Sequence, residues 1–163
     1  MRTLLIGIGV LALLGCSSLN DSSKVTSLTM QSYFETYRQR SDFNGFMDFY
    51  ADDVVVQDIV YGNELAGKSE VKAFFDWNRG QFELLDGKDI LTITRQTLEA
   101  QTVVTEGYFH RFRFNDQTLG PWRFVMIHEL DDDSKIIKQV DWINYTPREN
   151  FLGGLDMNEG LSE

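Results

Sequence analysis

Cysteine and proline are scarce in this sequence of 163 residues, which contains one cysteine and two prolines. The single cysteine, Cys16, excludes an intramolecular disulfide. The scarcity of proline, together with 42% hydrophobic and 13% aromatic residues, is typical of a folded globular chain. The length allows one domain with a single hydrophobic core.

Positive charge is also scarce, because 15 Lys and Arg residues face 25 Asp and Glu residues and give a formal net charge of -10. Nucleic acids are bound through Lys and Arg contacts to phosphates, so the composition argues against a nucleic-acid partner. The sequence contains no phosphate-binding loop, no Rossmann glycine pattern and no Ser-His-Asp arrangement. Its two histidines, His110 and His128, lack metal-ligand spacing, so we expect no metal and no other cofactor.

The N-terminus lacks an apolar run long enough to cross a bilayer, which needs about 20 residues. The eleven residues Leu4–Leu14 are apolar or glycine and follow Arg2, as in the hydrophobic region of a signal peptide. They lead into Leu13-Leu14-Gly15-Cys16, which resembles the lipobox of bacterial lipoproteins. We therefore interpret residues 1–15 as a lipoprotein signal peptide, and an ordinary secretory signal with an incidental cysteine is the alternative.

The lipobox resemblance implies that Cys16 is lipid-modified and becomes the mature N-terminus. Ser17 follows it, and by analogy with lipoprotein sorting this residue favours the outer membrane of a two-membrane bacterium. We therefore expect a protein of the cell envelope that is attached to the membrane through its N-terminal lipid. Residues 16–26 are mostly small and polar, and they predict a flexible lipidated tether.

Two periodicities follow one another along the rest of the chain. Apolar residues at helical spacing predict helices over 27–40, over 43–50 after an N-cap at Asp42, and from 69 to about 80 after an N-cap at Ser69. Alternating apolar residues predict strands, over residues 54–60, 90–98, 103–114, 122–130 and 136–145. The pattern indicates an α+β fold in which a curved antiparallel sheet wraps over three N-terminal helices. Residues 150–163 predict a disordered tail.

The run "SDFNGFMDFYADDVVVQDIVYG", followed by "LAGKSEVKAFF", resembles the opening of the nuclear transport factor 2-like superfamily. That group includes ketosteroid isomerases, SnoaL-like polyketide cyclases and scytalone dehydratase. The resemblance implies a SnoaL-like domain over residues 27–149, folded as a cone-shaped, cystatin-like α+β roll. It implies little about activity, because one scaffold of this kind hosts many functions.

Three acidic or phenolic positions take roles from this resemblance. Asp58 matches the general-base aspartate of the ketosteroid isomerases, and Tyr33 matches their oxyanion-hole tyrosine. Met126 stands where those enzymes have a protonated aspartate, so steroid isomerisation is not expected. Asp141 matches the acid/base aspartate of the SnoaL-like cyclases.

Strand alternation then predicts a pocket lined by aromatic residues, with Asp58 and Asp141 on its flanking strands and His128 as a further catalytic candidate. The other expected lining residues are Tyr37, Tyr50, Glu106, Tyr108, His110, Trp122, Phe124, Met126, Gln139 and Ile143. Trp142 points to the opposite face, which predicts a homodimer through the outer face of the sheet. Asp58 could alternatively be a structural acceptor of hydrogen bonds, and the two histidines could be ordinary strand residues.

Two functions of different classes remain open from the sequence. The domain could bind a small, largely apolar molecule at the cell envelope without transforming it. It could instead be an acid/base enzyme of isomerase, cyclase or dehydratase type, in which Asp58 or Asp141 removes a proton next to a carbonyl. A pocket filled by its own side chains would favour a third reading, a structural or dimerising module.

Overall fold

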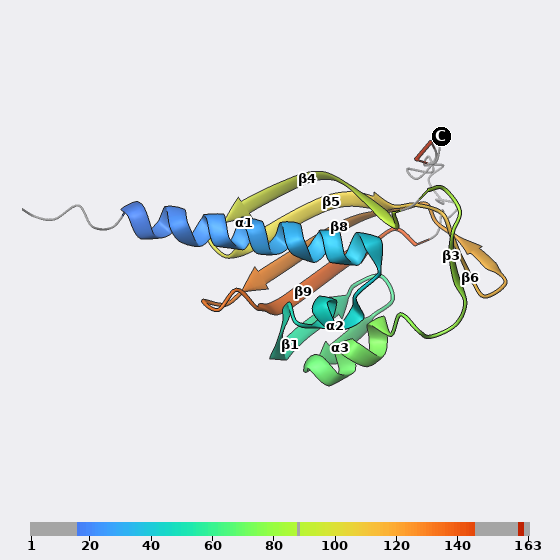
Figure 1. Cartoon of the computed structure of the whole chain (residues 1–163), viewed down its shortest axis with the longest axis horizontal. Coiled ribbons are helices and arrows are strands. Elements are labelled where there is room, and N and C mark those ends of the chain that lie inside the picture. The colour runs from blue at the N-terminus through green and yellow to red at the C-terminus, as the bar shows by residue number, and fades with distance from the viewer. Residues whose placement is uncertain (1–15, 88, 146–159, 162–163) are drawn as a thin grey trace, which may run out of the picture.

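A computed structural model describes residues 16–87, 89–145 and 160–161. The predicted signal peptide (1–15) and most of the predicted tail (150–163) lie outside the described residues, as does the side chain of Cys16. Three helices, α1 (Cys16–Gln39), α2 (Phe43–Met47) and α3 (Lys68–Phe75), lie on one side of a curved sheet (Figure 1). None of the described helices is long and apolar enough to cross a membrane.

The main sheet has six strands in the order β2-β1-β9-β8-β5-β4. Their bounds are β1 Tyr50–Asp58, β2 Asn63–Ala66, β4 Leu91–Glu99, β5 Thr102–Phe109, β8 Trp122–Leu130 and β9 Ile136–Ile143. The α+β class is confirmed, but the sheet is mixed rather than purely antiparallel, because β1 and β9 pair in parallel. This parallel pair joins the first strand to the last and aligns Asp58 with Asp141.

A second, smaller sheet was not expected from the sequence. It contains β3 (Phe82–Leu84), β6 (Phe112–Phe114) and β7 (Gln117–Leu119), in that order. The expected strand over 103–114 is therefore interrupted at His110 and Arg111, where the chain leaves the main sheet. The small sheet lies at one end of the molecule, beyond the C-terminal end of α1 (Figure 1).

Helix α1 begins at Cys16, well before the expected start at residue 27. Residues 16–26 are thus helical and not an irregular tether, because they contain neither glycine nor proline to interrupt the helix. Thr26 is buried and its hydroxyl donates a hydrogen bond to the Ser22 carbonyl, one helical turn earlier. Figure 1 shows the first turns of α1 extending past the edge of the sheet.

The other two helices are short. Asp42 caps α2 as predicted, since its carboxylate accepts a hydrogen bond from the Gly45 N–H at 2.9 Å. Helix α3 has its N-cap at Gly67 rather than Ser69, and the Glu70 carboxylate accepts a hydrogen bond from the Ala66 N–H. It ends at Phe75, before the predicted end near residue 80, and the following aromatic residue, Trp77, packs against the core.

The hydrophobic core lies between the three helices and the concave face of the main sheet. Tyr33, Phe46, Val54, Val71 and Ile136 are completely buried there. The alternating burial along β5 and β8 shows that one face of these strands meets the core and the other meets solvent. This alternation decides which predicted site residues point inward.

Candidate functional site

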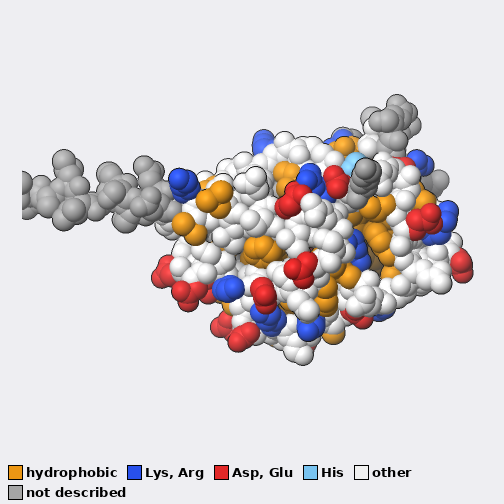
Figure 2. Space-filling view, viewed as in Figure 1, with side chains coloured by type: hydrophobic (Ala, Val, Ile, Leu, Met, Phe, Trp, Pro, Cys, Tyr) orange, Lys and Arg blue, Asp and Glu red, His pale blue; other side chains and the backbone are white. Residues whose placement is uncertain are grey.

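A cavity of about 190 Å³ opens between the concave face of the main sheet, the C-terminal end of α1, α3 and the small sheet. Its wall is largely aromatic and aliphatic, formed by Tyr37, Phe74, Phe75, Phe82, Ile90, Phe109, Phe112, Phe114, Trp122, Met126, Ile143 and Tyr145. Figure 2 shows hydrophobic side chains in a hollow beside the end of α1. An engineered apolar cavity of about 150 Å³ is large enough to hold benzene, so this one suits a ligand of one or two rings.

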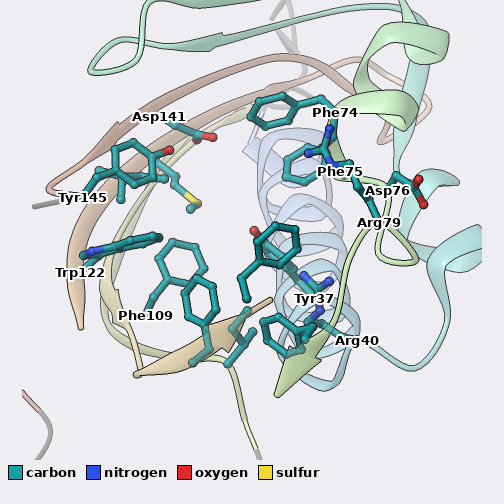
Figure 3. Close-up of a pocket in the computed structure, with 16 residues that line it drawn as sticks. Tyr37, Arg40, Phe74, Phe75, Asp76, Arg79, Phe109, Trp122, Asp141 and Tyr145 are labelled. Atoms are coloured by element: carbon teal, nitrogen blue, oxygen red, sulfur yellow. The ribbon is translucent and has the colours of Figure 1, made fainter. Parts of the chain in front are cut away.

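Four charged residues also line the cavity, namely Arg40, Asp76, Arg79 and Asp141. In Figure 3, Asp141 lies near Tyr145 and Trp122 on one side, whereas Arg40 lies near Tyr37 on the other. An apolar cavity that holds a few converging polar groups is the usual form of a small-molecule site.

Asp141 is the carboxylate that reaches the cavity from the main sheet. It is only 4% exposed, and the Gln139 amide donates hydrogen bonds to its two oxygens at 3.0 and 2.8 Å. Burial raises the pKa of Asp141 to about 7; the Gln139 amide opposes this rise and nearby Asp58 adds to it. A carboxyl group with such a pKa can exchange a proton near neutral pH.

Asp58 is buried beside Asp141 but is not among the residues that line the cavity. One of its oxygens accepts hydrogen bonds from the Val60 and Tyr61 N–H groups at 3.1 and 3.0 Å. The other accepts a hydrogen bond from the Tyr145 hydroxyl. These three hydrogen bonds explain why an apolar strand contains a buried carboxylate. Asp58 lies at the end of β1, where it binds the backbone of the following turn and holds Tyr145 at the cavity wall.

Tyr33, the expected oxyanion-hole residue, is completely buried and does not line the cavity. Its hydroxyl lies 2.8 Å from that of Tyr50, and the Tyr50 hydroxyl donates a hydrogen bond to Gln139 at 2.8 Å. Burial raises the pKa of both phenols well above the ordinary value. The pair therefore fixes Gln139, which in turn orients Asp141, and neither phenol reaches a ligand directly.

His128 is completely buried between aromatic residues of α1, with its ring centroid 5.1 Å from that of Tyr33. Neither ring nitrogen has a hydrogen-bond partner among the described residues. Burial lowers the pKa of His128 to about 3, with the neighbouring Gln139 amide opposing that change. The imidazole is therefore neutral at physiological pH and lies in the core, outside the lining of the cavity.

Three expected lining residues lie on the wrong face. Glu106 pairs with the exposed Val125, and it forms an ion pair with Arg95 outside the core. Tyr108 shares the face of Glu106, and His110, beyond the end of β5, bonds to the Thr92 hydroxyl at 2.9 Å. The reason is the register, since Thr105 rather than Glu106 stands opposite Met126. A shift of one residue reverses the face of every side chain in a strand.

The remaining predictions divide between the cavity and the core. The cavity lining includes the expected Tyr37, Trp122, Met126, Asp141 and Ile143. By contrast, Tyr50, Phe124 and Gln139 are buried outside it. Sequence reasoning missed Arg40, Arg79, Tyr145 and the aromatic residues of α3, β3 and β6, because the small sheet that carries several of them had no recognisable pattern.

Within the described part of the chain, no group of three His, Cys, Asp or Glu residues is placed to hold a metal ion.

Comparison with known proteins identifies the scaffold. A family model described as the SnoaL-like domain matches residues 30–139. No curated protein matches the chain.

Three solved structures illustrate the likeness in fold. A candidate ketosteroid isomerase from Kribbella flavida is 18% identical, with a TM-score of 0.58, and 85% of this chain and 94% of that chain are covered. An LEH-like epoxide hydrolase from M. tuberculosis is 16% identical, with a TM-score of 0.60, and the match covers 75% of this chain and 84% of that chain. A steroid delta-isomerase from Pseudomonas aeruginosa is 17% identical, with a TM-score of 0.54, and the match covers 78% of this chain and 82% of that chain. With the family match over most of the domain, the chain belongs to the SnoaL-like domain family.

Proposed function

We propose that the protein is an envelope lipoprotein whose SnoaL-like domain binds a small, largely apolar molecule in the cavity. The observation that carries this proposal is the cavity itself, about 190 Å³ and walled mainly by aromatic side chains. Ligand pockets for drug-sized molecules occupy roughly 300–1,000 Å³, so the natural ligand is smaller than those. A cavity that the protein's own side chains leave open favours ligand binding over a purely structural role.

Binding is testable with benzyl alcohol, a neutral ring with one polar group. Ligand-observed NMR should detect binding with a dissociation constant of about 1 mM or tighter, within the efficiency that such small ligands reach. The variant Ile143→Trp would fill the cavity, because Ile143 lines it from β9 and is buried. The matched control is Ile137→Trp on the same strand, where the side chain is 37% exposed.

We expect the Ile143 variant to lose benzyl alcohol binding and the Ile137 variant to keep it. Equal binding by both variants would show that the ligand occupies another place. The absence of binding to the native protein at several times the expected dissociation constant would contradict the proposal.

Acid/base catalysis is a second candidate, favoured by one observation. Asp141 lies at the cavity wall and has a pKa raised to about 7, so its carboxylate and its acid form coexist at neutral pH. In that function the carboxylate removes a proton from a carbon next to a ligand carbonyl. Deuterium exchange of 2-indanone in heavy water, followed by NMR, tests this step. Exchange above the solvent rate should rise with pH around 7 and disappear in Asp141→Asn.

Attachment to the membrane belongs to the same proposal and rests on the lipobox at residues 13–16. Metabolic labelling with a fatty-acid analogue should mark the native protein. Cys16→Ser should remain unmarked and appear in the soluble fraction, whereas Ser17→Ala should still be labelled. Membrane retention of the Cys16 variant at the native level would contradict the lipid anchor.

A further inference from the structure

Arg40 occupies an unusual position at the end of α1. Its backbone has φ of 49°, in the left-handed region, where a helix commonly ends on glycine. Its N–H still donates a hydrogen bond to the Thr36 carbonyl at 3.1 Å. A long side chain at such a position is unfavourable locally, and strained residues of this kind concentrate at functional sites.

The Arg40 guanidinium is half-buried among aromatic rings. Its central carbon lies 5.1 Å from the centre of the Trp77 ring and 4.3 Å from that of Phe82. These rings attract the cation but supply none of the oxygen acceptors that its five N–H donors require. Within residues 16–87 and 89–145, no ion pair joins this guanidinium to a carboxylate, and none of its nitrogens is buried without a partner, so its donors are accessible to a ligand. Burial accordingly lowers the pKa of Arg40.

A groove continues from the cavity past Arg40, which lines both. The residues of this groove include Arg38, Trp77 and Asn78, but none is acidic. The Trp77 indole N–H is buried and has no acceptor among the described residues. Arg38 of this groove pairs with Glu35 and Asp89, whereas Arg40 pairs with no carboxylate in the described part of the chain.

From these contacts we infer that the ligand of the cavity is a small aromatic or apolar carboxylic acid, bound as its anion with the carboxylate on Arg40. This inference rests on the proposed binding function and adds the class of ligand. A planar guanidinium binds a carboxylate through two parallel N–H donors, so the carboxylate supplies the acceptors that Arg40 lacks.

The arrangement also fixes the orientation of the ligand. Arg40 and Asp141 lie on opposite sides of the cavity (Figure 3). A carboxylate at Arg40 is thereby kept away from the Asp141 carboxyl group, which would repel it when ionised. The ring of the ligand then faces Trp122 and Tyr145, and its far edge faces Asp141.

Benzoate and benzyl alcohol test this inference, because they share a ring and differ in charge. At pH 8, isothermal titration calorimetry should give a dissociation constant for benzoate at least about tenfold lower than for benzyl alcohol, since a charge-assisted hydrogen bond exceeds a neutral one by about this factor. In Arg40→Gln the advantage of benzoate over benzyl alcohol should disappear. Arg40→Lys keeps the charge but not the paired donors, and it should retain only part of the advantage.

Arg113→Gln is the matched control. Arg113 forms an exposed ion pair with Glu83 on the small sheet and lines neither the cavity nor the groove. Its loss should leave both ligands unaffected. Equal affinity of the native protein for benzoate and benzyl alcohol, or an unchanged benzoate advantage in the Arg40 variants, would overturn the inference and leave the proposed function standing. Binding of neither ligand would refute both.

Discussion

Replacing Asp141 by asparagine should stabilise the protein above neutral pH, although it alters the cavity. The folded protein holds the pKa of Asp141 at about 7, against an ordinary value of 3.8. A carboxyl group with a raised folded pKa costs no stability below the unfolded pKa, and its cost grows as pH rises from about 4 to about 7. A difference of about three pH units corresponds to about 4 kcal/mol above pH 7.

Asparagine recovers only part of that cost. The Gln139 amide donates to both Asp141 oxygens, and asparagine retains one acceptor while placing its own N–H₂ near a donor. Loss of such a hydrogen bond costs about 1 kcal/mol. The net gain should therefore be about 2–3 kcal/mol at pH 8, and Asp141→Asn should show no gain at pH 4.

Urea unfolding of the two proteins at pH 4, 6 and 8 measures this difference. Contributions from other titrating groups, including His128, are shared by both proteins and cancel in the comparison. A difference that does not change with pH would show that Asp141 titrates normally in the folded protein. The reasoning about its burial would then fail, together with the case for proton transfer.

Three further perturbations test separate parts of the structure. Asp58→Asn should destabilise the protein by about 1–3 kcal/mol at neutral pH, because the Asp58 carboxylate accepts hydrogen bonds from Val60, Tyr61 and Tyr145; unchanged urea unfolding would contradict this structural role. His128→Leu should reduce the loss of protein stability between pH 7 and pH 4. In the native protein the pKa of His128 is about 3, so the folded state becomes less stable as the pH falls below about 6.5. An unchanged dependence of stability on pH in this range would contradict the prediction. Trp142→Glu should convert the proposed homodimer into a monomer, because Trp142 is 52% exposed on the outer face of the sheet; sedimentation of the native domain as a monomer would exclude that dimer.

The sequence predicted five of the six strands of the main sheet because their periodicity is strong, but it missed the short strand β2 and placed β1 over 54–60 rather than Tyr50–Asp58. Strand β8 runs from Trp122 to Leu130 as expected, and β9 begins at Ile136 as expected. The register between β5 and β8 could not be predicted in the same way. The register depends on the length and path of the segment between Phe109 and Trp122, which forms β6 and β7. This segment decides which residues of β5 lie opposite which residues of β8.

The site was predictable only where a residue was unusual for its surroundings. Asp58 and Asp141 are carboxylates within apolar strands, and both are buried as the sequence suggested. Arg40 gave no such signal, because a basic residue near the C-terminal end of a helix ordinarily lies in solvent and complements the helix dipole. Its contacts with Trp77 and Phe82 arise from the tertiary arrangement alone.

The parallel pairing of β1 with β9 has a consequence for the order of folding. It joins segments more than half the chain apart, with Asp58 aligned to Asp141 and the Ile59 N–H bonded to the Asp141 carbonyl at 3.0 Å. Closing so long a loop is slow and entropically costly, so this contact should form late. Fragments that end before β9 would keep their hairpins but would lack the wall that carries Asp141 and Ile143. Ligand binding would then report completion of the last folding step.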